Sequence, residues 1–228
     1  MKIQDNIVDE FNEFSKNYTN DMIGCVPYYL DLLSNITTGL PKQFNPKNIL
    51  DLGCGNGNIT TKLLPLFPKA SYTLLDASQE MINLCKKQFQ NNSIRYEVSF
   101  FKDFIFKEDH YDLIVAGFSL HHCEAKEKKE LFQKIYNSLN KGGIFSYSDL
   151  MIHKGDSAHP KLLKKWKAYV HESFPDGEKW KWIMEHYDEF DFPDNLDDQI
   201  DWLKNNGFNK IRRTSYEKYW THLSMLKE

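Results

Sequence analysis

The stretch that decides the fold is residues 48–58, which reads Asn48-Ile49-Leu50-Asp51-Leu52-Gly53-Cys54-Gly55-Asn56-Gly57-Asn58. Its first half is apolar, as in a buried strand, and its second half has glycine at alternate positions. Such glycines let the backbone turn sharply and approach a ligand closely, because no Cβ blocks positive φ. The pattern therefore predicts a strand, a ligand-binding loop and a helix. The dinucleotide pattern G-x-G-x-x-G differs, since it requires glycine where Asn58 stands.

The next expected strand ends in an acidic residue. Residues 71–75 are mostly apolar or β-branched, and Asp76 follows them directly. A carboxylate at the tip of this strand can accept hydrogen bonds from both hydroxyls of a ribose. We therefore expect Asp76 to bind the ribose of a nucleoside-containing cofactor.

The glycine-rich loop and the acid downstream of it together resemble class I S-adenosylmethionine (SAM) dependent methyltransferases. The resemblance implies SAM as the cofactor, S-adenosylhomocysteine as its product, and methyl transfer as the reaction. It also implies an α/β fold of the Rossmann-like, doubly wound kind. The sheet is then seven-stranded and mainly parallel, with an antiparallel last strand.

Strands and helices alternate along the chain, which is typical of a parallel sheet covered on both faces. The expected strands are 48–52, 71–76, 94–98, 111–116, 144–148, 208–213 and 217–225, and the expected helices are 58–64, 78–89, 126–139 and 196–206. Lys141-Gly142-Gly143 is expected to close the third helix. We expect a single domain over 1–228, with a helical N-terminal cap (1–45), a SAM-binding core (46–150), a helical lid (151–195) and a final helix and strands (196–228).

Ligands of such sheets bind beyond the carboxyl ends of the strands. The residues expected to bind the cofactor are Asp51, Gly53, Cys54, Gly55, Gly57, Asp76, Ala77, Met81, Asp103, Phe104, Gly117 and Phe118. The family usually places a second acid after the third strand, where it contacts the adenine amino group, but that position here is Phe100. Adenine recognition is therefore expected to use a stacked phenylalanine and backbone atoms, with Asp103 as a displaced substitute.

Methyl transfer from a sulfonium is a direct displacement, so the main task of the enzyme is alignment, and a base is optional. The candidate catalytic residues are His121, His122, Asp149, Tyr18 and Tyr28, and Tyr147 is a further candidate at the mouth of the site. Because adjacent side chains point differently, only one of the two neighbouring histidines is expected to face the substrate. No metal is expected, because the histidines show no regular ligand spacing.

The two ends of the chain resemble one branch of the family. Residues 11–14, 21–29 and 198–208 are similar to the cap and the final helix of the tRNA uridine-5-oxyacetic acid carboxymethyltransferase branch and its small-molecule relatives. That carboxymethyltransferase uses a carboxylated SAM, and the family supplies an arginine before the last helix. Residues 177–185 contain lysine but no arginine, and lysine cannot make a planar two-pronged contact with a carboxylate. Ordinary SAM is therefore expected.

Composition limits the partners and the location. The net charge of −3 gives no global basic surface for nucleic acid, although it leaves room for a local one. The four scattered cysteines suggest a reducing compartment. The chain has neither a membrane-spanning apolar run nor a signal-like N-terminus, so a cytoplasmic protein is expected.

The favoured function is methyl transfer from SAM to a small-molecule acceptor. Residues 161–170 are basic, amphipathic and aromatic, as in a lid helix that covers the transfer site. One alternative is a tRNA-modifying (carboxy)methyltransferase, and another is a SAM-binding protein without catalysis. The acceptor is not identified by the sequence, and a homodimer is also considered.

Overall fold

A computed structural model describes residues 17–90 and 93–228, so the similarity at residues 11–14 lies outside the described chain. One sheet has the strand order β3-β2-β1-β4-β5-β7-β6. The strands are β1 (Asn48–Leu52), β2 (Ser71–Asp76), β3 (Ile94–Val98), β4 (Tyr111–Gly117), β5 (Leu139–Leu150), β6 (Asn209–Tyr216) and β7 (Trp220–Leu226).

Strand direction follows the expected doubly wound pattern. Four neighbouring pairs, β1 with β2, β1 with β4, β2 with β3, and β4 with β5, are parallel. The β7 strand runs antiparallel to both of its neighbours, β5 and β6. The predicted fold class, with seven strands and an antiparallel strand near the chain end, is confirmed.

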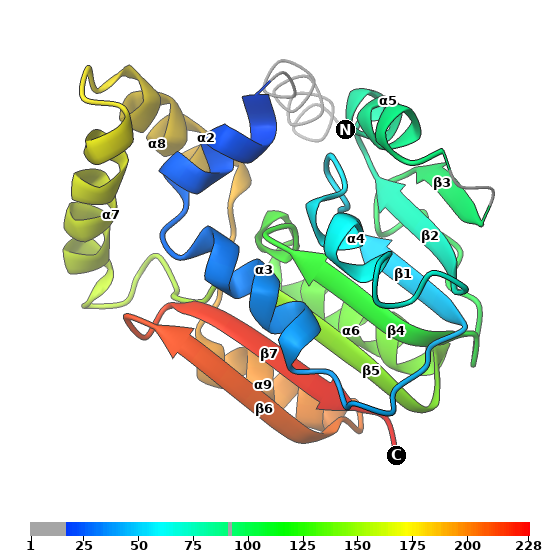
Figure 1. Cartoon of the computed structure of the whole chain (residues 1–228). Helices are drawn as coiled ribbons and strands as arrows, with labels where there is room; N and C mark the ends of the chain where they lie inside the picture. The colour runs from blue at the N-terminus through cyan, green and yellow to red at the C-terminus, as the bar shows by residue number, and fades with distance from the viewer. Residues whose placement is uncertain (1–16, 91–92) are drawn as a thin grey trace.

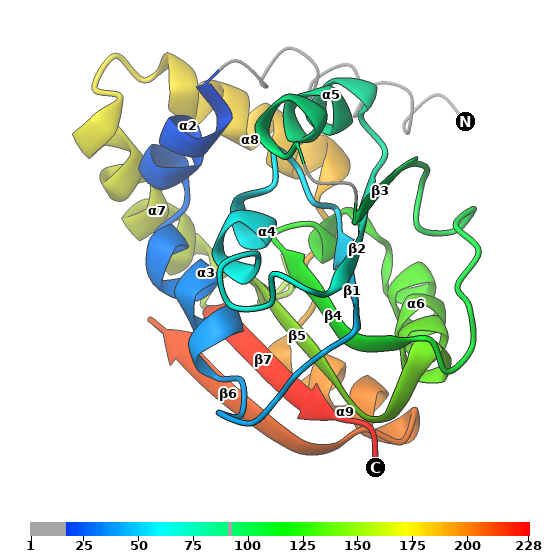
Figure 2. The same cartoon turned by 45° about the vertical axis from the view of Figure 1, so that its right-hand side comes forward.

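Helices cover both faces of the sheet (Figures 1 and 2). They are α3 (Tyr29–Thr38), α4 (Asn58–Leu63) and α5 (Gln79–Gln88) on one face, and α6 (Ala125–Ser138) and α9 (Leu196–Asn205) on the other. Successive side chains of β1 point to opposite faces of the sheet. Ile49 packs in the hydrophobic cluster on the face covered by α3, α4 and α5, and Leu50 packs in the cluster on the face covered by α6 and α9. Both side chains are fully buried, so the strand is covered on both sides.

Three further helices lie beyond the carboxyl ends of the parallel strands (Figure 1). They are α2 (Tyr18–Cys25) in the N-terminal cap and the lid helices α7 (His159–Ser173) and α8 (Glu178–Phe190). Trp166 on α7 donates from its indole Nε1 to the carbonyl of Cys25 at 2.6 Å, and Lys179 on α8 pairs with Asp21 at 2.7 Å. These contacts join the cap and the lid into one layer beyond the carboxyl ends of the parallel strands.

Two boundaries differ from the sequence prediction. The α6 helix ends at Ser138 and the chain passes directly into β5, so Gly142 and Gly143 shape an irregular start of that strand and do not close the helix. In the final hairpin, Glu217 and Lys218 both have positive φ, which makes them the turn between β6 and β7. The prediction that Glu217 begins the last strand was therefore wrong. Within residues 17–90 and 93–228, no helix is long and apolar enough to cross a bilayer.

Candidate active site

The glycine loop is held against the second strand by backbone hydrogen bonds. The amides of Gly53 and Cys54 donate to the carbonyl of Leu75 at 2.8 and 3.0 Å. Gly53 and Gly55 have φ of 64° and 53°, in the left-handed region that favours glycine. The loop therefore turns back towards the tip of β2 and carries its amides with it.

Asp76 is fixed by backbone donors on both sides. Its Oδ2 accepts from the amide of Gly55 at 2.8 Å, and its Oδ1 accepts from the amide of Ser78 at 2.9 Å. Each carboxylate oxygen retains capacity for a further hydrogen bond, so the group can still accept from ribose hydroxyls. Ser78 also caps α5, because its Oγ accepts from the amide of Met81 at 3.2 Å, at the position where the sequence predicted a helix to begin.

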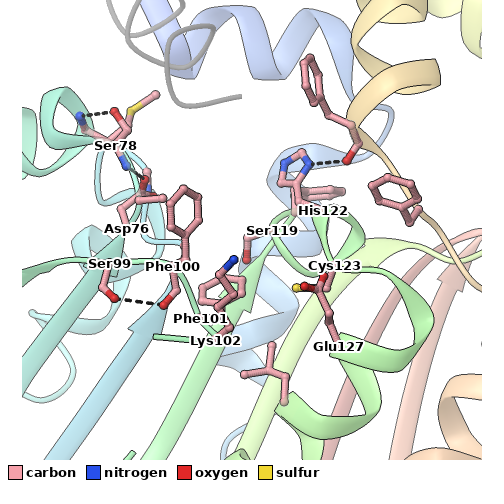
Figure 3. Close-up of a pocket in the computed structure, with 18 of the residues that line it drawn as sticks. Asp76, Ser78, Ser99, Phe100, Phe101, Lys102, Ser119, His122, Cys123 and Glu127 are labelled. Atoms are coloured by element: carbon pink, nitrogen blue, oxygen red, sulfur yellow. Dashed lines mark hydrogen bonds between the residues drawn. The ribbon is translucent and has the colours of Figure 1, made fainter. Parts of the chain in front are cut away.

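A cavity of about 400 Å³ opens beside Asp76 (Figure 3). Its lining includes eight of the residues predicted to bind the cofactor or to act in catalysis: Tyr18, Gly53, Gly55, Asp76, Ala77, Met81, Phe118 and His122. The volume lies within the usual range for a small-molecule site, and the walls combine aromatic carbon with a few fixed polar groups. An anchored carboxylate and an aromatic wall in one cavity fit a ligand made of a nucleoside joined to an amino acid, such as SAM.

Four predicted cofactor residues support this cavity from behind and do not line it. They are Asp51, Cys54, Gly57 and Gly117. A Cβ on Gly57 would lie 2.4 Å from the ring of Phe89, and one on Gly117 would lie 2.8 Å from Ile59, so both glycines allow close packing.

Asp51 is fully buried, and its Oδ2 accepts from the hydroxyl of Thr60 at 2.7 Å. Its second oxygen, Oδ1, accepts no hydrogen bond from the described residues. Burial, reinforced by the nearby charge of Asp76, raises the pKa of Asp51 to about 7 although the Thr60 hydroxyl opposes this. This carboxylate is therefore strongly desolvated.

The cavity wall next to Asp76 contains Ser99 and Phe100, and Phe101 and Lys102 continue it (Figure 3). The amide of Ser99 donates to the carbonyl of Asp76 at 3.0 Å. Phe100 therefore stands where adenine stacking was expected. Asp103 is exposed and does not line the cavity, so it makes a poor substitute acid. Phe104 packs edge-on against Phe106, with ring centroids 4.9 Å apart, against the hydrophobic core on the sheet face covered by α6 and α9. Asp103 lies within the turn that follows Phe100, and Phe104 lies at its end, where the amides of both residues donate to the carbonyl of Phe100 at 3.1 Å.

A second, smaller pocket of about 90 Å³ adjoins the first and is called the lid pocket here. The two cavities share Tyr18, Phe118 and His122 in their linings. The remaining walls of the lid pocket are mainly apolar and come from α2, β5, β7 and the lid. Four of their residues are aromatic: Trp166, Trp182, Tyr187 and Trp220. One end is polar, because His121, His122, His186 and Asp191 meet there.

His121 is held by Asp149 from the tip of β5. The His121 Nδ1 and the Asp149 Oδ1 are 2.5 Å apart, and the backbone amide of His121 donates to Oδ2 at 3.0 Å. Burial disfavours a charged imidazole, but the carboxylates of Asp149 and Asp191 outweigh it and raise the pKa of His121 to about 9. Asp149 is itself buried, faces this histidine, and lines neither the cofactor cavity nor the lid pocket.

His122 meets Asp191, which follows the lid helix α8. The distance from His122 Nδ1 to Asp191 Oδ1 is 3.1 Å, and His186 Nε2 lies 3.5 Å from the same oxygen. Burial and the neighbouring charge of His121 lower the pKa of His122 to about 4 in spite of Asp191. His122 is therefore neutral at pH 7, whereas His121 is a cation.

The sequence did not identify Asp191 or His186 as site residues, and it predicted that only one of His121 and His122 faces the substrate. Adjacent residues point differently on a regular strand, but these two lie on a short 3-10 turn, η2 (Leu120–His122), and both rings approach Asp191. Both histidines therefore line the lid pocket, although only one of them was expected to face the substrate. The available signal was a histidine and an acid in the lid segment, whose partners lie far away in sequence.

Two tyrosines are not at the mouth of the site. Tyr147 is fully buried on the opposite sheet face, where its hydroxyl donates to Gln199 Oε1 at 2.9 Å. Tyr28 stacks on Tyr216 with ring centroids 4.8 Å apart and lines a separate surface hollow. Neither side chain lines the cofactor cavity or the lid pocket.

Known proteins resemble this chain in sequence. Residues 49–143 match the methyltransferase domain family. The chain is 28% identical over 170 residues to a carboxy-S-adenosyl-L-methionine synthase of Campylobacter fetus, covering 71% of this chain and 70% of that protein. It is 27% identical over 216 residues to the synthase of that name from Campylobacter lari, covering 89% and 87%.

Solved structures show the same fold. A methyltransferase bound to the Haloferax volcanii Trm112 methyltransferase activator superposes with a TM-score of 0.69 at 13% identity, covering 96% of this chain and 97% of that one. The fold, the glycine loop and the family match together define a class I methyltransferase. The family match and the curated relatives, whose names include S-adenosyl-L-methionine, support SAM as the cofactor of this enzyme.

Proposed function

We propose that the enzyme transfers a methyl group from SAM to a nucleophile on a small molecule held in the lid pocket. The observation that carries this proposal is the junction between the two cavities. Tyr18, Phe118 and His122 belong to both linings, so a molecule in the lid pocket would meet a cofactor in the larger cavity there. Direct displacement requires this end-to-end arrangement of nucleophile and methyl group.

The lid pocket favours a compact, partly apolar acceptor. SAM supplies an electrophilic methyl group on a sulfonium, and the protein has to align the nucleophile and exclude water. Trp166, Trp182 and Trp220 provide the apolar wall, and about 90 Å³ leaves space for only a small group next to the reacting atom. The reacting end of the acceptor is therefore small, whatever is attached to it.

The polar end of the lid pocket supplies the groups that handle the nucleophile. In Figure 3 one ring nitrogen of His122 lies towards the carbonyl of Phe190 and the other towards the cavity. A neutral imidazole in this place can accept a hydrogen bond from an acceptor hydroxyl or amine. His121 stays charged between Asp149 and Asp191 and holds this corner in place.

The test is a turnover screen that follows S-adenosylhomocysteine. The purified protein is incubated with SAM and sets of small thiols, amines and hydroxyaromatics, with unmodified tRNA in a parallel arm. We expect product with a member of the small-molecule sets and none with tRNA alone. Turnover restricted to tRNA, with binding that weakens steeply as salt rises, would replace this proposal with the tRNA alternative. SAM binding without any turnover would favour the non-catalytic alternative.

The names of the relatives suggest one more reaction, the formation of carboxy-SAM. A carboxylated ligand needs a cation, and guanidinium is the group that binds carboxylates in two-pronged fashion. The three arginines of the chain are Arg95, Arg212 and Arg213, and none of them lines the cofactor cavity or the lid pocket. The cofactor cavity has Lys102, Lys126 and Lys134 in its lining, which supply charge without that geometry. Ordinary SAM and methyl transfer are therefore the better fit.

A further inference from the structure

We propose that His121, His122 and Asp191 form a binding site for one divalent transition-metal ion, for which Zn²⁺ is the probe. Each residue offers one ligand atom, and these atoms all lie within 4.8 Å of one another. Two imidazoles and one carboxylate are a common donor set for zinc and for other first-row divalent ions. This proposal departs from the sequence-based expectation that no metal is bound.

The spacing of the ligand atoms suits a tetrahedral ion. With metal–ligand bonds of about 2.0–2.1 Å, two ligand atoms on a tetrahedron stand roughly 3.3 Å apart. Asp191 Oδ1 lies 3.1 Å from His122 Nδ1 and 3.6 Å from His121 Nε2. Both edges are close to the tetrahedral value. The two histidine nitrogens lie within 4.8 Å of each other, so a shift of their side chains would close the site around an ion.

A supporting carboxylate stands behind one of the ligands. Asp149 Oδ1 lies 2.5 Å from His121 Nδ1, and Nε2 faces Asp191. The His121 imidazolium would therefore keep its Nδ1 proton against Asp149 and release its Nε2 proton to solvent when the ion binds. A carboxylate that accepts from the far nitrogen of a metal-bound histidine is a recurrent feature of metal sites, because it fixes the tautomer and raises ligand basicity. Asp149 therefore fits a positioning role at a metal centre.

The third ligand is held in place by its own chain segment. The amide of Phe192, next to Asp191, donates to the carbonyl of His121 at 2.6 Å, and Lys128 Nζ donates to the carbonyl of Phe192 at 2.9 Å. Asp191 Oδ1 is buried and accepts no well-aligned hydrogen bond from any residue in the described ranges. A buried carboxylate oxygen facing imidazole nitrogens, without a donor aligned to it, suits a ligand such as a cation.

The site lies at the polar end of the lid pocket, where His186 flanks Asp191 at 3.5 Å. Three protein ligands leave a fourth position, as in catalytic zinc sites. An ion here would lower the pKa of an acceptor thiol or hydroxyl bound at that position. Since His122 Nδ1 would then bind the ion, activation of the acceptor would pass from this imidazole to the metal. This role in acceptor activation rests on the proposed function, whereas metal binding itself does not.

The test uses full-length protein without any histidine tag, stripped with a chelator and titrated with Zn²⁺ by calorimetry. We expect one ion per chain. His122→Gln and Asp191→Asn should each weaken binding at least tenfold, and Asp149→Asn by about 10–100-fold through loss of the supporting contact. His110→Gln is the matched control, because His110 precedes β4 at the end of the strand opposite His121, and its affinity should equal that of the wild type.

Substitution of Co²⁺ for Zn²⁺ gives a second readout, since a four-coordinate site yields strong visible absorption that the His122→Gln variant should lose. A folded wild type that binds no stoichiometric Zn²⁺, or ligand variants that bind as tightly as His110→Gln, would overturn the site. Circular dichroism and SAM titration of each variant show whether it has folded. Loss of SAM binding with intact Zn²⁺ binding would count against the proposed function alone, and the reverse would count against the metal site alone.

Discussion

The cofactor side and the acceptor side of the cleft are built in different ways. Backbone amides from two neighbouring strand ends hold Asp76, so this half depends on a short local motif. The acceptor side instead joins side chains from η2, the tip of β5 and the end of α8, which are far apart in the chain. A shared cofactor can thus be bound by a recurrent local structure, while the acceptor site depends on how remote segments meet.

The largest expected effect is a loss of SAM affinity on substitution in the glycine loop, the short local motif of the cofactor side. Gly55→Arg should reduce SAM affinity more than 100-fold, because a long side chain would enter the cavity from a position whose φ of 53° also favours glycine. Calorimetric titration with SAM measures it. The wild type is expected to bind more tightly than about 100 μM, which corresponds to roughly −5.5 kcal/mol.

Gly142→Arg is the matched control for that variant. Gly142 also has a positive φ, of 80°, but open space surrounds the position of a Cβ there. The Gly142→Arg variant should therefore introduce the same kind of backbone strain without blocking the cavity. Its SAM affinity should stay within about threefold of the wild type, a difference below 1 kcal/mol. Equal losses in both variants would show that strain, not occupation of the cavity, is responsible.

On the acceptor side, His122→Gln should separate turnover from cofactor binding. The side chain lies at the junction, so we expect turnover to fall about 10–100-fold with the acceptor found in the screen, in the range of lost general acid–base or positioning groups. SAM affinity should change less than threefold, because the cofactor side is held by other residues. A parallel loss of SAM binding would mean that the two sides are not separable.

The fold could be predicted because its signals are local. Glycines at alternate positions, Asp76 after a buried strand and Ser78 at a helix start each act within a few residues, and the structure has them as expected. The start of β5 was not predicted, because Gly142 and Gly143 taken alone suggest the end of a helix. In the structure, hydrogen bonding to the neighbouring β4 and to the end of the β7 segment extends β5 through these two glycines. Tertiary pairing decided that boundary.

The candidate site was predicted only in part, for the same reason. A motif indicates which strand end bears a residue but not the direction of its side chain. Tyr147 therefore looked accessible at the fifth strand although it faces the opposite core. Asp191 was missed because its significance appears only when α8 returns it to His121 and His122. Contacts between segments that are remote in the chain produce no recognisable residue spacing in the sequence.

A smaller effect concerns stability on the cofactor side. Burial raises the pKa of Asp51 to about 7, so the folded protein holds a proton there that the unfolded chain releases above about pH 4. The carboxyl therefore costs stability increasingly as pH rises from about 4 to 7, and fully above 7. Asp51→Asn should stabilise the protein by about 1–4 kcal/mol at pH 8 and by little at pH 4. Urea unfolding at the two pH values measures the difference, and an equal gain at both would contradict the pKa.

The smallest effect tests how the lid is attached. Tyr169 on α7 donates from its hydroxyl to the carbonyl of Ile23 in the cap at 2.6 Å, and Tyr96 makes a comparable bond to the carbonyl of Phe89 at 3.0 Å beside the cofactor half. Each Tyr→Phe change should cost about 1 kcal/mol, or roughly 2–4 °C in Tm. Only Tyr169→Phe should also raise the acceptor KM a few-fold, because it loosens the layer that closes the lid pocket. If Tyr96→Phe raised KM equally, the acceptor side would depend on global stability and the contrast between the two halves would fail.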